Sequence, residues 1–202
     1  MPSIITHAAV PLALWCAADR GRIPPRLLAA GVIASMLPDA DVLAFALHIP
    51  YADAFGHRGA SHSLLFACVL AMVAALALGV GRGRPWSALS CQPRLAPTTQ
   101  AARLASTVQA ATFVFICAAS HPLLDAMTSG GLGVALAWPW SEQRFFAPWR
   151  PIRVSPFAPQ FFSARGIATL LSELRWVWLP LAGAVAAWKL IQPAPAAPRD
   201  PS

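Results

Sequence analysis

The sequence predicts an all-α fold: a polytopic α-helical membrane protein with about four to five transmembrane or partly spanning helices. Composition is the first reason, because 57% of the 202 residues are hydrophobic and only 11% are charged, whereas soluble domains carry about 25% charged residues. The second is that apolar runs follow one another along the whole chain and leave no polar block able to bury its own core. We therefore expect a single membrane-embedded domain over residues 1–191 and a disordered Pro-rich tail over 192–202.

The lengths of the apolar runs decide which of them can cross a membrane alone. Crossing the hydrocarbon core takes roughly 20 residues, so the run at 64–80 is the clearest span, and the last two runs, the final one extended back to Leu170, are further candidates. The first run is only about 18 Å long as a helix. The second is equally short before Pro38 interrupts it, so these two are expected to be partial spans or helices extended by polar ends. The runs are 7–18, 27–37, 42–50, 64–80, 108–127 and 176–191.

Basic residues indicate which side of the membrane each connection faces, since cytoplasmic loops carry an excess of Lys and Arg. One side would hold Arg20, Arg22, Arg26, Arg82, Arg84, Arg94, Arg103, Lys189 and Arg199, and the other Arg58, Arg144, Arg150, Arg153, Arg165 and Arg175. We expect the larger group to be cytoplasmic. This pattern and attraction to anionic headgroups account for the net charge of +7. No zinc finger, basic helical stripe or aromatic stacking motif indicates nucleic-acid binding, so the expected partners are membrane lipids, and the oligomeric state stays open.

On this topology, the polar side chains suited to chemistry fall at one level, opposite the arginine-rich segments. A first helix begins at His7 after an expected N-cap at Thr6. The remaining residues are Asp39 and Asp41 after the second run, His57, Arg58 and His62 before the third helix, and His121 and Asp125 at the end of the fourth. The topology used only Lys and Arg, so this agreement is independent of it.

The stretch "SHPLLDAMTSGG" indicates a metal site. His121 and Asp125 are four residues apart, so they share one face of a helix, and an ionisable residue inside a membrane is costly enough to suggest a function. Imidazole and carboxylate groups without a thiolate cluster suit Zn²⁺ foremost, with Mn²⁺ or Fe²⁺ as alternatives. The sequence therefore predicts a divalent metal site.

Each of these residues also has a simpler interpretation. A single His in an apolar helix is more often a hydrogen-bonded core group. Asp39 and Asp41 can cap a helix or form an Asx turn, and His57 and His62 can lie at the membrane interface. His48 has no acidic neighbour in register, so we assign it to this structural class. The metal interpretation is stronger for the set, because six or seven such groups converge in a chain with five His and eight acidic residues.

The segment "WPWSEQRFFAPWRPIRVSPF", residues 138–157, interleaves aromatic residues, prolines and arginines. It is typical of an aromatic belt at the membrane interface. It also suits a lid over the site, in which Arg144, Arg150 or Arg153 pairs with a phosphate through a bidentate fork. The two interpretations are compatible.

A family resemblance supports the metal interpretation. "ITHAAVPLA", "ASMLPDADVL", "HRGASHSLLFA", "SHPLLDAMTSGG" and the aromatic segment together resemble the YdjM-like family of predicted membrane-bound metal-dependent hydrolases, in order from residue 4 to about 157. The resemblance implies a bacterial inner-membrane protein with a divalent-metal site and hydrolase activity. The chain is also more weakly similar to zinc-dependent phospholipase C. On that pattern the ligands are His7, Asp39, His57 or His62, His121 and Asp125. No His follows residue 121, which favours one or two ions over three.

These observations predict a hydrolase acting on an ester or phosphoester at a periplasmic, interface-level site. The location of the site favours a lipid or lipid-linked phosphate as the substrate. Asp41 or a ligand carboxylate would take the proton, and Arg58 would steady anionic charge. The alternative is a non-catalytic metal-binding membrane protein that transports, senses or scaffolds. A transporter should show internal repeats and a midplane site, and no convincing repeat is found.

Overall fold

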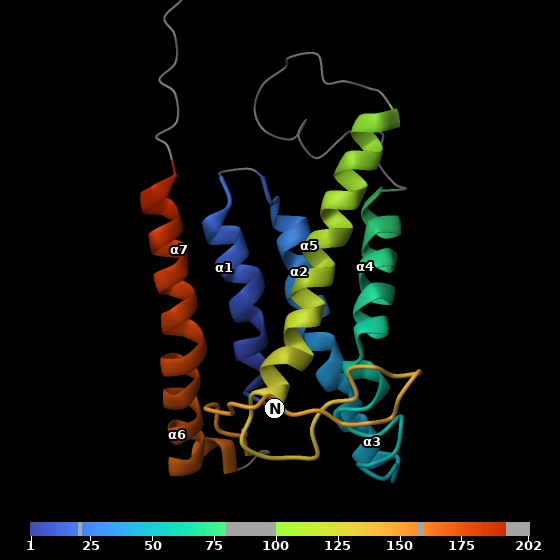
Figure 1. The fold of residues 1–202 in the computed structure, drawn as a ribbon, viewed down its shortest axis with the longest axis vertical. Helices are drawn as coiled ribbons and strands as arrows, with labels where there is room; N and C mark the ends of the chain where they lie inside the picture. Colours follow the sequence, from blue (N-terminus) through green and yellow to red (C-terminus); the bar gives the residue numbers. More distant parts are fainter. Residues whose placement is uncertain (20–21, 80–99, 157–159, 193–202) are drawn as a thin grey trace, which may run out of the picture.

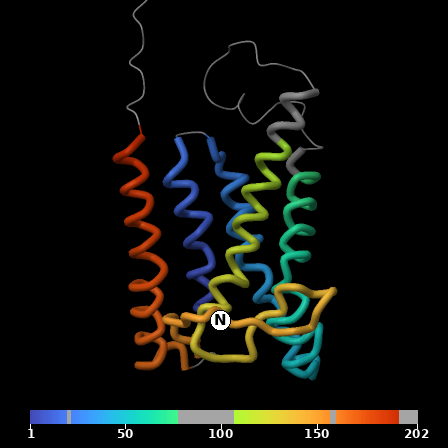
Figure 2. Tube along the Cα trace, viewed as in Figure 1, coloured from blue at the N-terminus to red at the C-terminus, as the bar shows by residue number. Residues whose placement is uncertain are grey.

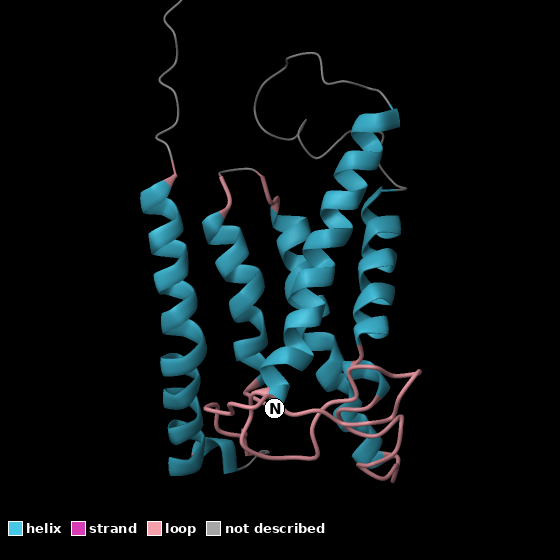
Figure 3. Ribbon diagram, in the orientation of Figure 1, coloured by secondary structure: helices cyan, strands magenta, loops and turns pink. Residues whose placement is uncertain are grey.

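Apolar helices run side by side along one axis, and long loops gather at one end of them (Figure 1). The computed structural model describes residues 1–19, 22–79, 100–156 and 160–192. The α-helices are α1 Ala9–Ala17, α2 Pro25–Met36, α3 Leu43–Ala46, α4 Leu64–Gly79, α5 Gln100–Ala126, α6 Ala164–Glu173 and α7 Leu179–Ile191. The 3-10 segments are η1 Ile4–Ala8, η2 Leu37–Val42, η3 Ala60–His62 and η5 Gln160–Phe162, and η6 Leu174–Trp178 is a π-helical turn. The described residues contain no strand, which confirms the all-α prediction (Figure 3).

Three helices are long and apolar enough to cross a membrane: Pro25–Ala46, Thr107–Ala126 and Ala164–Ile191. Ile4–Ala17 and Leu64–Ala77 are shorter apolar helices in the described part of the chain. Of the two alternatives predicted for the second run, a partial span interrupted at Pro38 and a helix extended by polar residues, the structure shows the extended helix. Pro38 lies at the start of η2, where the N–H that proline lacks is needed least, so α2, η2 and α3 form one span.

Two sequence predictions reach into residues that the structure does not describe. The run at 64–80 was expected to be the clearest span, and its described part is one of the shorter apolar helices. The linker 81–105 is outside the described residues up to position 99, and so is the predicted tail apart from Gln192.

Small side chains pack the helices together. Ala34, Ala67, Ala71, Ala110 and Ala118 form much of the core between α2, α4 and α5. Small residues let helix backbones approach closely, which is how helices associate inside a membrane. Larger apolar side chains such as those of Ile33, Met72 and Leu190 point outward, toward the lipid region expected around the bundle.

The start of the chain is fastened to the last long helix. Glu173 is 1% exposed, and its carboxylate accepts hydrogen bonds from the Ser3 backbone N–H at 2.5 Å, the Ser3 hydroxyl at 2.6 Å and the Thr6 hydroxyl at 2.7 Å. Thr6 is therefore not the expected N-cap: it lies inside η1, whose N-cap position is Ser3. The trace places the N-terminus at the loop end of the bundle (Figure 2), which brings His7 to the level of the last turn of α5.

Candidate metal centre

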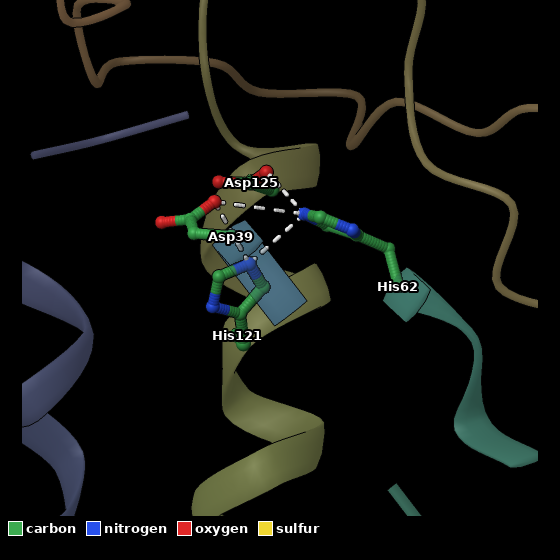
Figure 4. A group of neighbouring side chains, drawn as sticks. All are labelled: Asp39, His62, His121 and Asp125. Atoms are coloured by element: carbon green, nitrogen blue, oxygen red, sulfur yellow. Dashed lines mark hydrogen bonds and ion pairs between the residues drawn. The ribbon is translucent and has the colours of Figure 1, made fainter. Parts of the chain in front are cut away.

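Four buried side chains turn their ligand atoms toward one point at the loop end of the bundle. They are Asp39 from η2, His62 from η3, and His121 and Asp125 from α5. Their ligand atoms all lie within 4.8 Å of one another. Figure 4 shows the two imidazoles and two carboxylates facing a shared centre.

The separations between these atoms match those around a single small cation. His62 Nε2 lies 3.2 Å from Asp125 Oδ2 and 3.9 Å from Asp39 Oδ1, and His121 Nε2 lies 3.4 Å from Asp39 Oδ1. Zn²⁺ bonds of about 2.1 Å in tetrahedral geometry place neighbouring donors about 3.4 Å apart. The Nε2 atoms of His62 and His121 approach to 2.9 Å, an arrangement that suits two donors to one ion.

His7 adds a fifth side chain to the edge of this group. Its Nε2 lies 3.6 Å from both Asp39 Oδ2 and Asp125 Oδ1, and its ring stacks on that of His121 with 3.7 Å between centroids. Among the described residues, neither ring nitrogen of His7 and no carboxylate oxygen of Asp39 or Asp125 has a hydrogen-bond partner. Buried polar atoms normally have partners, so this donor set fits a bound cation.

The charges at the centre also favour a divalent cation. Asp39, Asp41 and Asp125 bring three carboxylates together, and the guanidinium group of Arg58 lies 3.0 Å from Asp125 Oδ2 through its Nε. With the histidines in the neutral form that binds metal, the three carboxylates and Arg58 leave two negative charges at a site removed from water. Uncompensated buried charge is costly, and one divalent cation would neutralise it.

Hydrogen bonds from outside the group orient the two imidazoles. His121 Nδ1 lies 2.7 Å from the Ser35 carbonyl oxygen, so an Nδ1–H donates there and Nε2 is left to bind a metal. His62 Nδ1 lies 3.0 Å from Asp41 Oδ2. A carbonyl or carboxylate behind each imidazole is the usual arrangement in metal sites, because it fixes the ring and raises its basicity.

Comparisons with known proteins agree with a membrane location. A model of the YdjM inner membrane protein family matches residues 1–196. The chain belongs to the YdjM family. It is also similar to the inner membrane protein YbcI of Escherichia coli (strain K12), with 45% identity over 181 residues that cover 89% of this chain and 92% of that protein. No solved structure matches significantly, and the comparisons do not show the weaker resemblance to zinc-dependent phospholipase C.

In this YdjM-family protein, the structure separates the two histidines that the sequence left as alternatives. His62 joins the four-residue group, whereas His57 is not brought into it: its Nδ1 lies 2.5 Å from Asp41 Oδ1. Asp41 also accepts hydrogen bonds from the Arg58 backbone N–H at 2.9 Å and the Ser61 hydroxyl at 2.6 Å. Asp41 therefore holds His57 and His62 in place and lies behind the centre.

The predicted arginines have different surroundings. Arg58 is fully buried. Besides its ion pair with Asp125, its guanidinium group donates to the Gly130 carbonyl and the Thr128 hydroxyl, each at 3.0 Å. Arg144 donates to the carbonyl oxygens of His57 and Tyr51 at 3.0 Å and of Asp53 at 2.9 Å, so it fastens the loop that carries His57. Arg150 is exposed and lies over the Phe146 ring at 4.7 Å.

A cavity of about 940 Å³ adjoins the centre. Its lining includes His57, Arg58, Arg153 and Arg165. Sequence reasoning gave Ser35, Glu173 and Arg165 no role at the site. Ser35 acts through its backbone carbonyl, which carries no side-chain signal, but the isolated acidic Glu173 in an apolar helix was a signal that could have been used.

Proposed function

We propose that this protein is a membrane-bound metal-dependent hydrolase of esters or phosphoesters, with its site facing the periplasm. The observation that carries the proposal is the juxtaposition of the buried His/Asp centre with an open cavity lined by His57. Zn²⁺ is the first candidate, and Asp39, His62, His121 and Asp125 would hold it, with His7 beside them. A divalent cation bound there would polarise the scissile group and activate water.

His57 is the side chain best placed to move a proton. It lines the cavity, and its Nδ1 faces Asp41 Oδ1, so Asp41 would keep the proton on Nδ1 and direct Nε2 to proton transfer. A carboxylate that orients a histidine in this way recurs in hydrolytic sites. The predicted roles of Asp41 and Arg58 change accordingly: Asp41 acts through His57, and Arg58 balances the charge of Asp125.

Metal content tests the centre. His121→Ala or Asp125→Ala should remove most of the metal from the purified protein, since no other ligand replaces the lost group. His48→Ala is the matched control, because His48 is exposed and outside the group. Stoichiometric metal in both ligand variants would contradict the centre.

Activity tests the hydrolase assignment. The purified protein should cleave a member of a panel of ester and phosphoester substrates and lose this activity on chelation. His57→Gln should lower kcat by about 10²-fold to 10⁴-fold while metal content stays at the wild-type level. Asp41→Asn should shift the pH dependence of kcat, which a purely structural role would leave in place. A protein that binds metal but cleaves no substrate in the panel would favour transport, sensing or scaffolding.

A further inference from the structure

We propose that Arg153 and Arg165 bind phosphate oxygens in the cavity beside the metal centre, so that the substrate carries a phosphate group. The inference rests on the proposed function only for the link to catalysis. The evidence for the binding site itself is the cavity, its charge and its position.

The cavity has a strongly positive lining. Arg58, Arg153 and Arg165 contribute to it, and the described lining residues include no Asp or Glu. Side chains able to donate hydrogen bonds, among them Tyr51, Ser129 and Gln160, complete the wall. Guanidinium groups match phosphate through paired N–H donors, so this lining suits a phosphate better than a neutral or cationic group.

Arg153 and Arg165 differ from the other arginines of this end in having no competing partner. Arg58 and Arg144 use their guanidinium groups on protein oxygens, whereas the described residues offer no ion pair or side-chain hydrogen bond to Arg153 or Arg165. Both are exposed. The sequence had offered Arg144, Arg150 or Arg153 for this role. Of these three, Arg153 lines the cavity, whereas Arg144 and Arg150 do not.

The backbone around the two arginines is fixed. The Arg153 N–H donates to the Ser172 hydroxyl of α6 at 3.0 Å, and the Thr169 hydroxyl donates to the Arg165 carbonyl at 3.0 Å. The segment carrying Arg153 is thus attached to the helix carrying Arg165. Because the backbone positions of the two arginines are already fixed, binding has to order only their side chains.

The cavity joins two environments that one amphipathic ligand would use together. Arg58 lines it and contacts Asp125 of the metal centre. On α6, Arg165 and Thr169 line the cavity, and Ile167 and Leu171, each 60% exposed on another face of the helix, present apolar side chains suited to lipid. A phosphate with an attached acyl or polyprenyl chain fits this arrangement. A soluble phosphate would contact the same arginines but not the apolar side chains.

Binding by purified full-length protein tests the inference. Inorganic phosphate and glycerol 3-phosphate would be titrated calorimetrically, and the same micelles would be doped with dioleoyl phosphatidate or dioleoyl phosphatidylcholine. Arg153→Gln and Arg165→Gln should each weaken phosphate binding by about tenfold, and the double variant by more. Arg175→Gln is the matched control: Arg175 follows in the same helical segment, is exposed and does not line the cavity.

The outcomes separate the ligand sources and the two proposals. Arginine-dependent binding of the soluble phosphates, or of phosphatidate over phosphatidylcholine, supports the site and identifies its source. Unchanged binding in the double variant, or an equal loss in Arg175→Gln, overturns it. Arginine-dependent binding without hydrolysis would leave the site standing while the proposed function fails. Hydrolysis with an unchanged KM in the double variant would support the proposed function and overturn the phosphate site. Wild-type metal content and monodisperse elution would show that the variants are folded.

Discussion

His62 uses its two ring nitrogens for different contacts. Nδ1 faces Asp41, and Nε2 faces His121, Asp39 and Asp125. Burial lowers the pKa of this imidazole, but the carboxylates of Asp125 and Asp41 outweigh burial and raise the pKa to about 9. In the absence of metal, the position therefore attracts a proton, which a cation has to displace.

A pH dependence of metal binding follows from this competition. Because His62 is protonated below about pH 9 in the metal-free protein, the apparent affinity for Zn²⁺ should rise with pH and fall by about tenfold per pH unit below that value. Calorimetric titrations in two buffers of different ionisation enthalpy should detect proton release at pH 7.5. Absence of proton release would show that the imidazole is already neutral.

Gly131 is a position near the centre where an added side chain would be poorly tolerated. Its φ is +90°, and a Cβ there would lie 2.7 Å from Arg58 Nη1 and 2.8 Å from the Tyr51 hydroxyl. Gly131→Ala should displace Arg58 from Asp125 and cost about 1–3 kcal/mol. A lower melting temperature and reduced metal content in detergent would report this. Gly130→Ala, whose methyl group would meet Val154 at 3.4 Å, should change neither by as much.

At the scale of elements, the contact between α2 and α5 sets the geometry of the centre. The helix that begins as α2 carries Asp39, and α5 carries His121 and Asp125. Gly31 lets the two helices approach: a Cβ there would lie 2.5 Å from Phe113 Cε1 and 3.0 Å from Cys117 Sγ. The Ser35 carbonyl reaches His121 one turn further along.

Gly31→Val should therefore separate α2 from α5. We expect a loss of about 1–3 kcal/mol, as for other overpacked cores, together with weaker metal binding. Gly183→Val is the control, because it introduces the same side chain into a helix, α7. An added Cβ at Gly183 would have nothing within 4 Å. Equal melting temperatures for the two variants would contradict the role assigned to this contact.

The sequence predicted those parts of the centre that depend on local spacing. His121 and Asp125 share a helix face because they are four residues apart, and the order of the runs brought Asp39 to their level. It could not choose between His57 and His62. That choice depends on the loop between them, where Arg58 has a φ of +63° and Asp41 holds both rings. Nor could it find the partners of Arg144, because these are backbone carbonyls, which look alike at every position.

At the scale of the whole molecule, the candidate ligands lie at one end of the bundle, as the order of the runs predicted (Figure 1). The first turn of α2 and the last turns of α4 and α7 lie at the other end. The chemistry depends on this separation, whereas the substrates that the centre can meet depend on which end faces the periplasm.

Reporter fusions would decide the orientation. A reporter active only in the periplasm should be active after Gly56 and inactive after Gln92, because the linker at 81–105 carries four arginines and no acidic residue. The reverse pattern would place the centre at the cytoplasmic face. It would redirect the search for substrates to cytoplasmic lipid intermediates without changing the metal chemistry.

The hydrogen bonds of Glu173 to Ser3 and Thr6 have a consequence for biosynthesis. They join residues 170 and 167 positions apart, next to His7, the first candidate ligand. During translation, Ser3 and Thr6 are made long before Glu173, so these hydrogen bonds form only after the last long helix has been synthesised. Asp39 likewise meets its partners only after α5 has been made. Loading of the proposed metal would thus be a late event that follows synthesis of the last long helix, and a truncated or stalled chain would lack the assembled centre.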